Sequence, residues 1–165
     1  MAENIQMLRG IPMQYEPKRP NRFIAVFDES LGIEIWSIQK FKRPQLKINP
    51  VEIKYMNTSN WVAGNYVWQP IEVTFIDTIG PSTSEKLMDW VRLHAESISG
   101  RMGYAAGYKK TITLKQLDPT GFPIDKWTLE ECMITDINMG DNDHESDAVQ
   151  TITLTLQPFR CIHNI

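Results

Sequence analysis

The clearest alternation of apolar and polar residues in the chain lies in the segment 66–77. Ile71, Val73 and Phe75 are separated by polar residues, which is the period of two expected of a strand with one buried face. We therefore predict a single strand over this segment, with its apolar side chains in the core.

A pattern with helical spacing follows over about residues 82–99. Pro81 ends the strand, and Ser82 with Glu85 fits a capping box, which satisfies free backbone N–H groups of the first turn. We expect Gly100 to end the helix. Apolar residues form one stripe along it: Leu87, Trp90, Val91, Ala95 and Ile98. With no comparable second helix, the pattern predicts a mainly β (α+β) fold, an antiparallel β-barrel or sandwich with one packed α-helix.

The remaining apolar patterns are short and strand-like. The predicted strands are 22–27, 33–40, 51–55, 110–117, 126–129, 132–138 and 149–159. We expect the first two to form a hairpin, and 110–117 to reverse through Asp118–Gly121, which has the Pro and Gly positions of a tight turn. The last residues are expected to be frayed.

Hydroxyl and carboxylate side chains lie opposite the apolar positions of three strands. They are Glu72, Thr74, Thr111, Thr113, Thr151, Thr153 and Thr155. We predict that they form one smooth polar sheet face without aromatic residues or a basic cluster.

Two segments show no regular pattern. Residues 1–20 carry three prolines in a polar background and are expected to be an extended arm, which either docks on a neighbouring subunit or is a floppy terminus. Residues 41–65 are expected to be a long loop or hairpin. Within it Trp61 either folds back onto the core or anchors another chain.

The composition fits one soluble domain. The chain has 165 residues, a net charge of −3 and a pI near 5.6, which argue against a basic, high-affinity nucleic-acid binder. The sequence shows no signal-peptide pattern and no apolar run near the ~20 residues of a membrane span, so synthesis in a cytoplasm is expected. Cys132 and Cys161 have no neighbours at metal-ligand spacing, and free thiols are the default, with a disulfide left open.

No motif predicts catalysis or a cofactor. The acidic segment 140–147 lacks the glycine and the closing glutamate of a calcium loop, so a solvated loop is expected. His94 borders the helix stripe and is expected to be half-buried and hydrogen-bonded. Cys161 and His163 are close in sequence but lack a third orienting group. We therefore expect a protein that is not an enzyme.

Six motifs, in this order, carry a family resemblance: Asn21-Arg22-Phe23, Val62-Ala63-Gly64, the strand Trp68–Phe75, the helix from Ser84, Thr113–Asp118 with its Gly-turn hairpin, and Thr151–Leu156. Together they resemble the tail tube proteins of contractile-tailed, T-even-like bacteriophages, and more distantly the tube proteins of type VI secretion. The resemblance covers roughly residues 20 to 160. It departs at 56–61 and in the proline-rich arm.

The resemblance implies a single tail tube domain over 1–165 and a structural virion protein assembled in the host cytoplasm. It implies hexameric rings whose inner strands join into one barrel, stacked into a tube beneath a tail sheath. Further implied partners are the tape-measure protein, baseplate and tail terminator proteins, and phage DNA in transit without sequence-specific binding. No cofactor, metal or membrane anchoring is implied.

Residues are assigned to these roles as expectations. The candidate lumen residues are Glu72, Thr74, Thr113, Lys115, Asp136, Thr153 and Thr155. The candidate subunit contacts are Tyr15, Pro17, Pro20, Tyr55, Trp61, Tyr66, Asp141 and Asp143. The alternatives are a baseplate or tail-completion ring protein of the same fold, the tube protein of a related injection system, and a small-molecule or metal-binding β-barrel. The last should contain a concave apolar pocket with converging polar groups.

Overall fold

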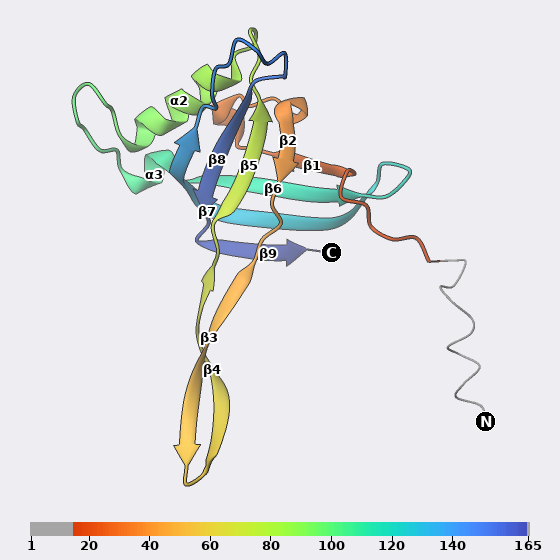
Figure 1. Ribbon diagram of the computed structural model, residues 1–165, viewed down its shortest axis with the longest axis vertical. Helices are drawn as coiled ribbons and strands as arrows, with labels where there is room; N and C mark the ends of the chain where they lie inside the picture. Colours follow the sequence, from red (N-terminus) through yellow and green to blue (C-terminus); the bar gives the residue numbers. More distant parts are fainter. Residues whose placement is uncertain (1–14, 165) are drawn as a thin grey trace.

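Two layers of antiparallel strands share one long strand, and a two-stranded hairpin projects from them (Figure 1). The computed structural model describes residues 15–164. Its strands are β1 (Phe23–Val26), β2 (Ile38–Phe41), β3 (Leu46–Tyr55), β4 (Thr58–Trp68), β5 (Ile71–Ile76), β6 (Lys110–Leu117), β7 (Pro123–Asn138), β8 (Thr151–Gln157) and β9 (Arg160–Asn164). Its helices are α2 (Thr83–His94) and the short α3 (Ala105–Tyr108), with single helical turns η1 (Glu29–Leu31) and η2 (Ile35–Ser37). The predicted mainly β fold with one main packed helix is confirmed.

The long strand β7 belongs to both layers. Its first half pairs with β6 and β9, in the layer that also contains β1. Its second half pairs with β8, in the layer that contains β5 and β2. The strands of the two layers cross steeply in Figure 1, as in orthogonal sheet packing, where a bent strand passes from one sheet to the other. The bend lies at Glu131, whose φ is 52°.

Apolar side chains from both layers fill the space between them. Ile71, Val73 and Phe75 of β5 are buried, as their alternation predicted. The other buried side chains include Ile112 and Leu114 of β6, Leu129 and Cys132 of β7, and Ile152, Leu154 and Leu156 of β8. The interior between the layers is therefore a packed core.

Helix α2 covers this core with Leu87 and Trp90, both fully buried. The Trp90 ring meets Phe27 edge-on with centroids 6.2 Å apart, and its Nε1–H donates to the Tyr108 carbonyl at 2.8 Å. At the start of the helix the Ser82 hydroxyl accepts from the Glu85 N–H at 3.3 Å, so the predicted N-cap is confirmed.

The predicted end of the helix near residue 99 is wrong. The helix ends at His94, and the chain turns so that the Gly103 N–H donates to the His94 carbonyl at 3.0 Å. A Cβ atom on Gly103 would lie 1.9 Å from the Leu93 carbonyl oxygen, so only glycine permits this approach. Ile98 consequently leaves the apolar stripe and is 97% exposed.

The predicted hairpin of 22–27 with 33–40 is also wrong. β1 pairs with β6 and β2 pairs with β5, so the two segments lie in different layers. The Asp28 side chain accepts from the Ser30 N–H at 2.9 Å, and Gly32 follows η1 with a φ of 61°. This local hydrogen bonding favours a helical turn, which carries the chain from one layer to the other.

The segment 66–77, predicted as one strand, forms two strands, β4 and β5. Pro70 between them has no N–H to donate, and the strand pairing changes partner there.

The loop alternative for 41–65 is wrong, since most of this segment belongs to the β3–β4 hairpin. The two strands predicted at 126–129 and 132–138 are one strand, β7. The C-terminal residues predicted to be frayed form β9, which pairs with β7.

Candidate functional site

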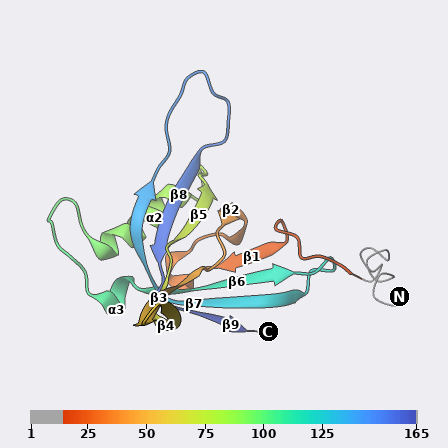
Figure 2. The same cartoon turned by 60° about the horizontal axis from the view of Figure 1, so that its bottom comes forward.

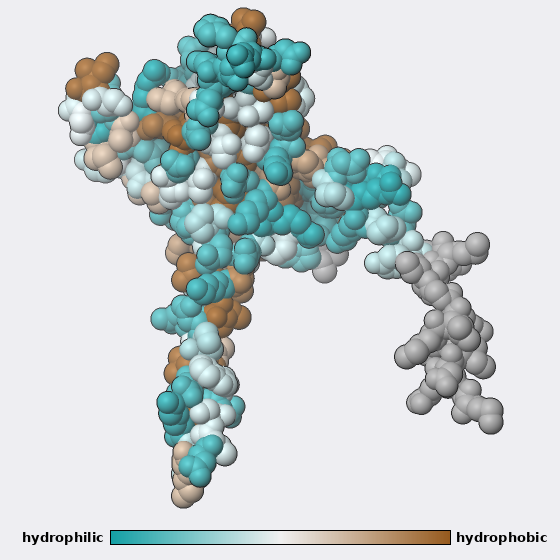
Figure 3. All heavy atoms as spheres, viewed as in Figure 1, coloured by the Kyte–Doolittle hydropathy of each residue, from teal (hydrophilic) through white to brown (hydrophobic). Residues whose placement is uncertain are grey.

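The β3–β4 hairpin projects from the body as an exposed ribbon (Figure 1). Its strands pair from Leu46 opposite Trp68 at the root to Tyr55 opposite Thr58 at the tip. Its large exposed apolar side chains are Leu46, Ile48, Val51, Ile53, Tyr55, Met56, Trp61, Val62, Tyr66 and Val67. Figure 3 shows hydrophobic surface gathered near the root of the hairpin. Because an isolated two-stranded ribbon is marginally stable in water, so much apolar surface indicates a partner.

Both faces of the ribbon carry apolar residues. Val51 opposes Val62 on one face, and Trp61 opposes Glu52 on the other. Trp61 is 59% exposed, so the interpretation that it folds back onto the core is wrong. Its role as an anchor stays a prediction.

Two open grooves flank the root of the hairpin. One, of about 560 Å³, lies toward the turn between β8 and β9 and is lined by residues that include Tyr66, Trp68, Met133, Pro158 and Phe159. The other, of about 520 Å³, lies along β9 and is lined by residues that include Leu46, Ile48, Ala63, Tyr66 and Ile162. Both grooves lie where the hairpin meets the body, outside the packed core. A ligand-binding barrel would instead have its cavity inside the core.

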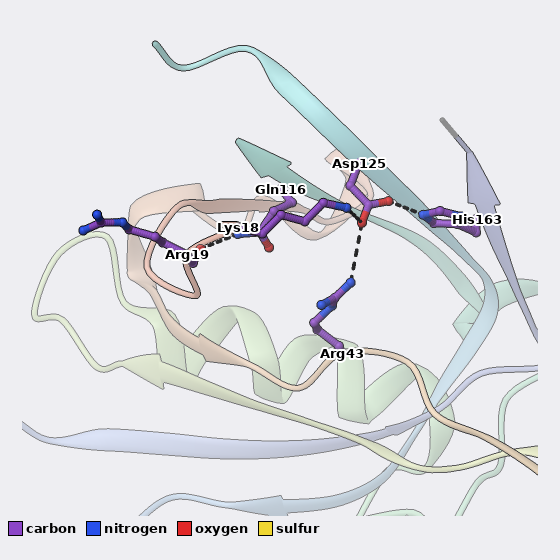
Figure 4. A network of polar contacts seen from close by, with 6 residues as sticks. All are labelled: Lys18, Arg19, Arg43, Gln116, Asp125 and His163. Atoms are coloured by element: carbon purple, nitrogen blue, oxygen red, sulfur yellow. Dashed lines mark hydrogen bonds and ion pairs between the residues drawn. The ribbon is translucent and has the colours of Figure 1, made fainter. Parts of the chain in front are cut away.

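A buried carboxylate ties three distant segments together (Figure 4). Asp125, at the start of β7, is 4% exposed. Lys18 of the arm lies 3.0 Å from its Oδ2, and Arg43, between β2 and β3, lies 3.5 Å from the same atom. His163 of β9 contacts its other oxygen. The described part of the arm is therefore held against the body, while residues 1–14 lie outside the described residues.

The environment of Asp125 favours its charged form. Burial raises the pKa of this carboxyl, but the hydrogen bonds and charges of Lys18 and His163 outweigh burial and leave the pKa below its ordinary value of 3.8. The network connects Lys18 of the arm, Arg43 before the hairpin and His163 of β9 to the start of β7. The contact residues predicted in the arm, Tyr15, Pro17 and Pro20, are exposed beside it.

Five candidate lumen residues share one polar face. Glu72 opposes Thr155, Thr74 opposes Thr153, and Asp136 also opposes Thr155. Because the intervening residues are buried, these side chains lie on the outer face of the β2–β5–β8–β7 layer.

The prediction of one continuous polar face is wrong. Thr113 and Lys115 lie on β6, opposite Thr128 and Lys126, on the outer face of the other layer. The strands of the two layers cross steeply, so the outer face of this layer is turned away from the outer face of the β2–β5–β8–β7 layer (Figure 1). Thr113 and Lys115 therefore lie apart from the five residues of the first face.

The acidic segment lies in the loop between β7 and β8, which projects from the body in Figure 2. Asp141 and Asp143 are exposed there, and the Asp143 carboxylate accepts from the Glu145 N–H at 3.0 Å.

Within residues 15–164, no three His, Cys, Asp or Glu side chains are placed to hold a metal ion. No helix in this range is long and apolar enough to cross a membrane.

His94 links α2 to β7, as a half-buried and hydrogen-bonded residue. Its Nδ1 lies 3.0 Å from the Trp90 carbonyl, and its Nε2 accepts from the Ile134 N–H at 3.0 Å, which requires a neutral ring with the proton on Nδ1. Burial lowers the pKa of His94 below 6.5, against a smaller opposing effect of the Trp90 hydrogen bond. Its ring stacks on Tyr108 with centroids 4.3 Å apart.

The two cysteines are free and buried. Burial raises the pKa of Cys132 to about 12 and of Cys161 to about 11, so neither is a ready nucleophile. The suggested neighbour of Cys161, His163, contacts Asp125 instead.

Solved structures with a similar fold were found, whereas comparisons by sequence found no match. No protein-family model and no curated protein matches the sequence. A chain from the sheath/tube terminator of an extracellular contractile injection system, PVC, superposes with a TM-score of 0.75 and 18% identity over 92% of this chain and 99% of that one. A chain of the PVC sheath–tube complex gives 0.72 and 17% over 92% and 93%. The SPP1 tail tube gives 0.55 and 13% over 90% and 79%.

The protein has the tail tube fold. At identities of 13–18% the likeness shows the fold alone. The fold assigned from the sequence resemblance is thereby confirmed.

Sequence reasoning missed three parts of the candidate site in this tail tube fold: the root of β3, Asp125 and β9. Leu46 and Ile48 alternate with polar residues, which is the pattern of a strand. The nearby Pro44 and Pro50 argued against a strand there and hid this pattern. Asp125 follows a turn-like segment and looks solvated in the sequence. Its partners Lys18, Arg43 and His163 are 107, 82 and 38 residues away, so only the fold brings them together.

Proposed function

We propose that this protein is a structural subunit that assembles into stacked rings and forms the hollow tube of a phage tail or a related contractile injection system. The observation that carries the proposal is the β3–β4 hairpin, an exposed apolar ribbon on a body whose own core is complete. Such a surface is stable in water only when other chains cover it.

The hairpin and the acidic loop supply the stacking contacts. They lie at opposite ends of the molecule along its longest axis in Figure 1. A head-to-tail stack therefore brings Tyr55 and Trp61 of one ring toward the loop of the next, which contains Asp141 and Asp143, while Tyr66 lies at the root of the hairpin. The arm, with Tyr15, Pro17 and Pro20, completes the contacts between subunits.

The outer face of the β2–β5–β8–β7 layer forms the lumen. It presents Glu72, Thr74, Asp136, Thr153 and Thr155, with Lys40 of β2 beside Thr74. A surface of hydroxyls and carboxylates holds phosphates weakly, whereas a lysine-rich one would retain them by releasing counterions. DNA therefore passes without being bound.

From the family resemblance we further propose six subunits in each ring and a sheath outside the tube. A tape-measure protein would lie inside the tube, and baseplate and terminator proteins at its ends. The location is then a virion or an extracellular injection particle. Its role is structural and not catalytic.

A terminating ring is the second candidate, since the compared structures include a sheath/tube terminator. Such a subunit would form one ring and stop. A ligand-binding barrel is disfavoured because the two grooves at the hairpin root lie outside the packed core.

Negative-stain electron microscopy across a concentration series, with mass from light scattering, tests the proposal. We expect hollow tubes that lengthen with concentration. Single rings at every concentration would favour the terminator. A particle that stays monomeric throughout would contradict both.

A further inference from the structure

Two lysines lie directly opposite each other on the outer face of the β1–β6–β7–β9 layer. Lys115 of β6 pairs with Lys126 of β7, and neither has an ion-pair partner among residues 15–164. Lys126 is exposed and Lys115 is partly exposed. Like charges at directly opposed positions destabilise a sheet. The pair therefore destabilises the isolated chain, and an acidic partner would remove the repulsion.

Aliphatic side chains flank the two lysines on the same face. Ile24 of β1 opposes Lys115. Val26 and Ile162 lie in the next row of paired residues across the sheet, and all three side chains are partly exposed. We call this surface the lysine face. Its residues are Ile24, Val26, Thr113, Lys115, Lys126, Thr128 and Ile162.

The acidic loop between β7 and β8, residues 139–150, carries the opposite charge. Its four carboxylates are exposed and have no ion-pair partner in the described part of the chain: Asp141, Asp143, Glu145 and Asp147. Val149 in the same loop is 65% exposed. The loop therefore combines carboxylates with an aliphatic side chain, and it complements the lysine face in charge and in polarity.

The base of the acidic loop is held by hydrogen bonds. The Gln150 side chain donates to the Met139 carbonyl at 3.0 Å, and the Gly140 N–H donates to the Asn138 side chain at 2.9 Å. The loop projects from the body in Figure 2. A projecting segment that is already ordered loses less conformational entropy when it binds.

We propose that the acidic loop of one copy docks on the lysine face of a second copy. The loop and the lysine face of one chain lie too far apart to meet, because the strands β6, β7 and β9 lie at the hairpin end of the body and the loop lies at the other end (Figure 1). The contact is therefore head-to-tail, and such contacts propagate from one copy to the next.

This inference rests on the proposed stacking of rings and names the surface that receives the loop. The hairpin of the second copy extends from the same end as its lysine face, so a loop that a stack brings toward the hairpin also reaches this face. The contact gives a role to Lys115, which lies apart from the five lumen candidates of the other layer.

Zero-length cross-linking tests the contact in wild-type protein. A carbodiimide joins a carboxylate to an amine that touches it, so tubes grown from a mixture of isotopically light and heavy chains are treated, digested and measured by mass spectrometry. We expect peptides that link Lys115 or Lys126 to residues 141–147, with one light and one heavy partner. Protein too dilute to form tubes should give none. Tubes that lack this link would overturn the inference.

Charge exchange gives an independent readout. Lys115→Glu/Lys126→Glu should raise the protein concentration at which tubes form by about tenfold or more, because carboxylates then face carboxylates at every subunit. Asp141→Lys/Asp143→Lys in that background should restore tube formation. Arg92→Glu, on the exposed face of α2, is the matched control and should leave tube formation unchanged.

Monomer stability separates docking from folding. Lys126→Glu replaces the like-charge pair by an opposite-charge pair, so the thermal midpoint of the monomer should stay equal or rise, while tube formation should need more protein. A lower midpoint with tubes at the wild-type concentration would refute the docking role. Wild-type tubes in which neither cross-linking nor charge exchange detects the contact would refute this inference alone. Wild-type protein that never forms tubes would refute the proposed tube function as well.

Discussion

Trp90 and Trp61 are the same amino acid in two opposite environments. Trp90 is fully buried under α2 with its N–H bonded to a carbonyl, whereas Trp61 stands on the hairpin with 59% of its surface exposed. The contrast extends to the two regions around them. The core uses apolar residues to fold one chain, whereas the hairpin leaves a similar set exposed, which we propose other chains cover.

The two regions also differ in how their apolar residues are arranged. In the core, β5 and β8 alternate buried and polar positions, so each strand has one apolar face. In the hairpin, charged residues such as Lys47, Glu52 and Lys54 are mixed with apolar ones on both faces. Such charges limit uncontrolled association of an exposed ribbon. A ribbon that must be covered on both sides is suited to lie between subunits.

The largest expected effect on folding comes from the core tryptophan. Trp90→Ala removes a fully buried ring and leaves the Tyr108 carbonyl without its donor. We expect a loss of about 3–5 kcal/mol in the free energy of unfolding. Urea titration followed by circular dichroism measures it. A loss below about 1 kcal/mol would show that α2 contributes little to the core.

Asp125→Asn tests the network that joins the body to the arm and to the segment before the hairpin. Losing the charge weakens the contacts to Lys18, Arg43 and His163, with an expected loss of about 2–3 kcal/mol at neutral pH. Asp147→Asn, in the exposed loop, is the control.

The effect of Asp125→Asn should depend on pH. The pKa of Asp125 is below 3.8 in the folded protein, so its stabilisation is present above that pH and is lost as the pH falls through the folded value. The difference between wild type and variant should therefore shrink in strong acid. A difference that is constant from pH 7 to pH 2 would contradict a charged Asp125.

Trp61→Ala should separate assembly from folding. The free energy of unfolding of the monomer should change by less than about 0.5 kcal/mol, because the side chain is exposed. Assembly should weaken by about 2 kcal/mol, or roughly 30-fold in the concentration at which tubes form. Light scattering measures this, with Trp61→Phe as the control that keeps an aromatic anchor. Equal assembly by the Ala variant and wild type would remove Trp61 from the interface.

The smallest effect concerns His94. Its pKa is lowered in the fold, so below about pH 6.5 the unfolded chain takes up a proton that the folded chain does not. The free energy of unfolding should therefore decrease as the pH falls from 7.5 to 5.5, and His94→Gln should flatten this dependence. A pH profile identical for His94→Gln and wild type would contradict the neutral His94 bridge.

Prediction from the sequence was most accurate for strands that have one buried face and one exposed face. The alternation in β5, β6 and β8 and the N-cap at Ser82 determine local structure directly, and they were confirmed. The end of α2 was missed because it depends on a close backbone approach at Gly103, which periodicity does not encode.

The surfaces were harder to predict because they depend on contacts between distant segments. The candidate lumen residues on β5 and β8 share a face through strand pairing, whereas Thr113 and Lys115 lie on β6, in the other layer. The hairpin was anticipated only as an alternative to a loop. Its β-pattern lacks the usual signal of a buried face, since both faces are exposed.

Removal of the hairpin tests the central claim most directly. The Gln69 N–H donates to the Gln45 carbonyl at 2.9 Å, and Leu46 opposes Trp68, so residues 47–67 can be replaced by an Asn-Gly turn without moving the body. We expect the shortened protein to unfold cooperatively with a near-wild-type midpoint and to form no tubes by electron microscopy, whereas the wild type does. Shortened protein that forms tubes at the same concentration as the wild type would contradict the claim that the hairpin serves assembly.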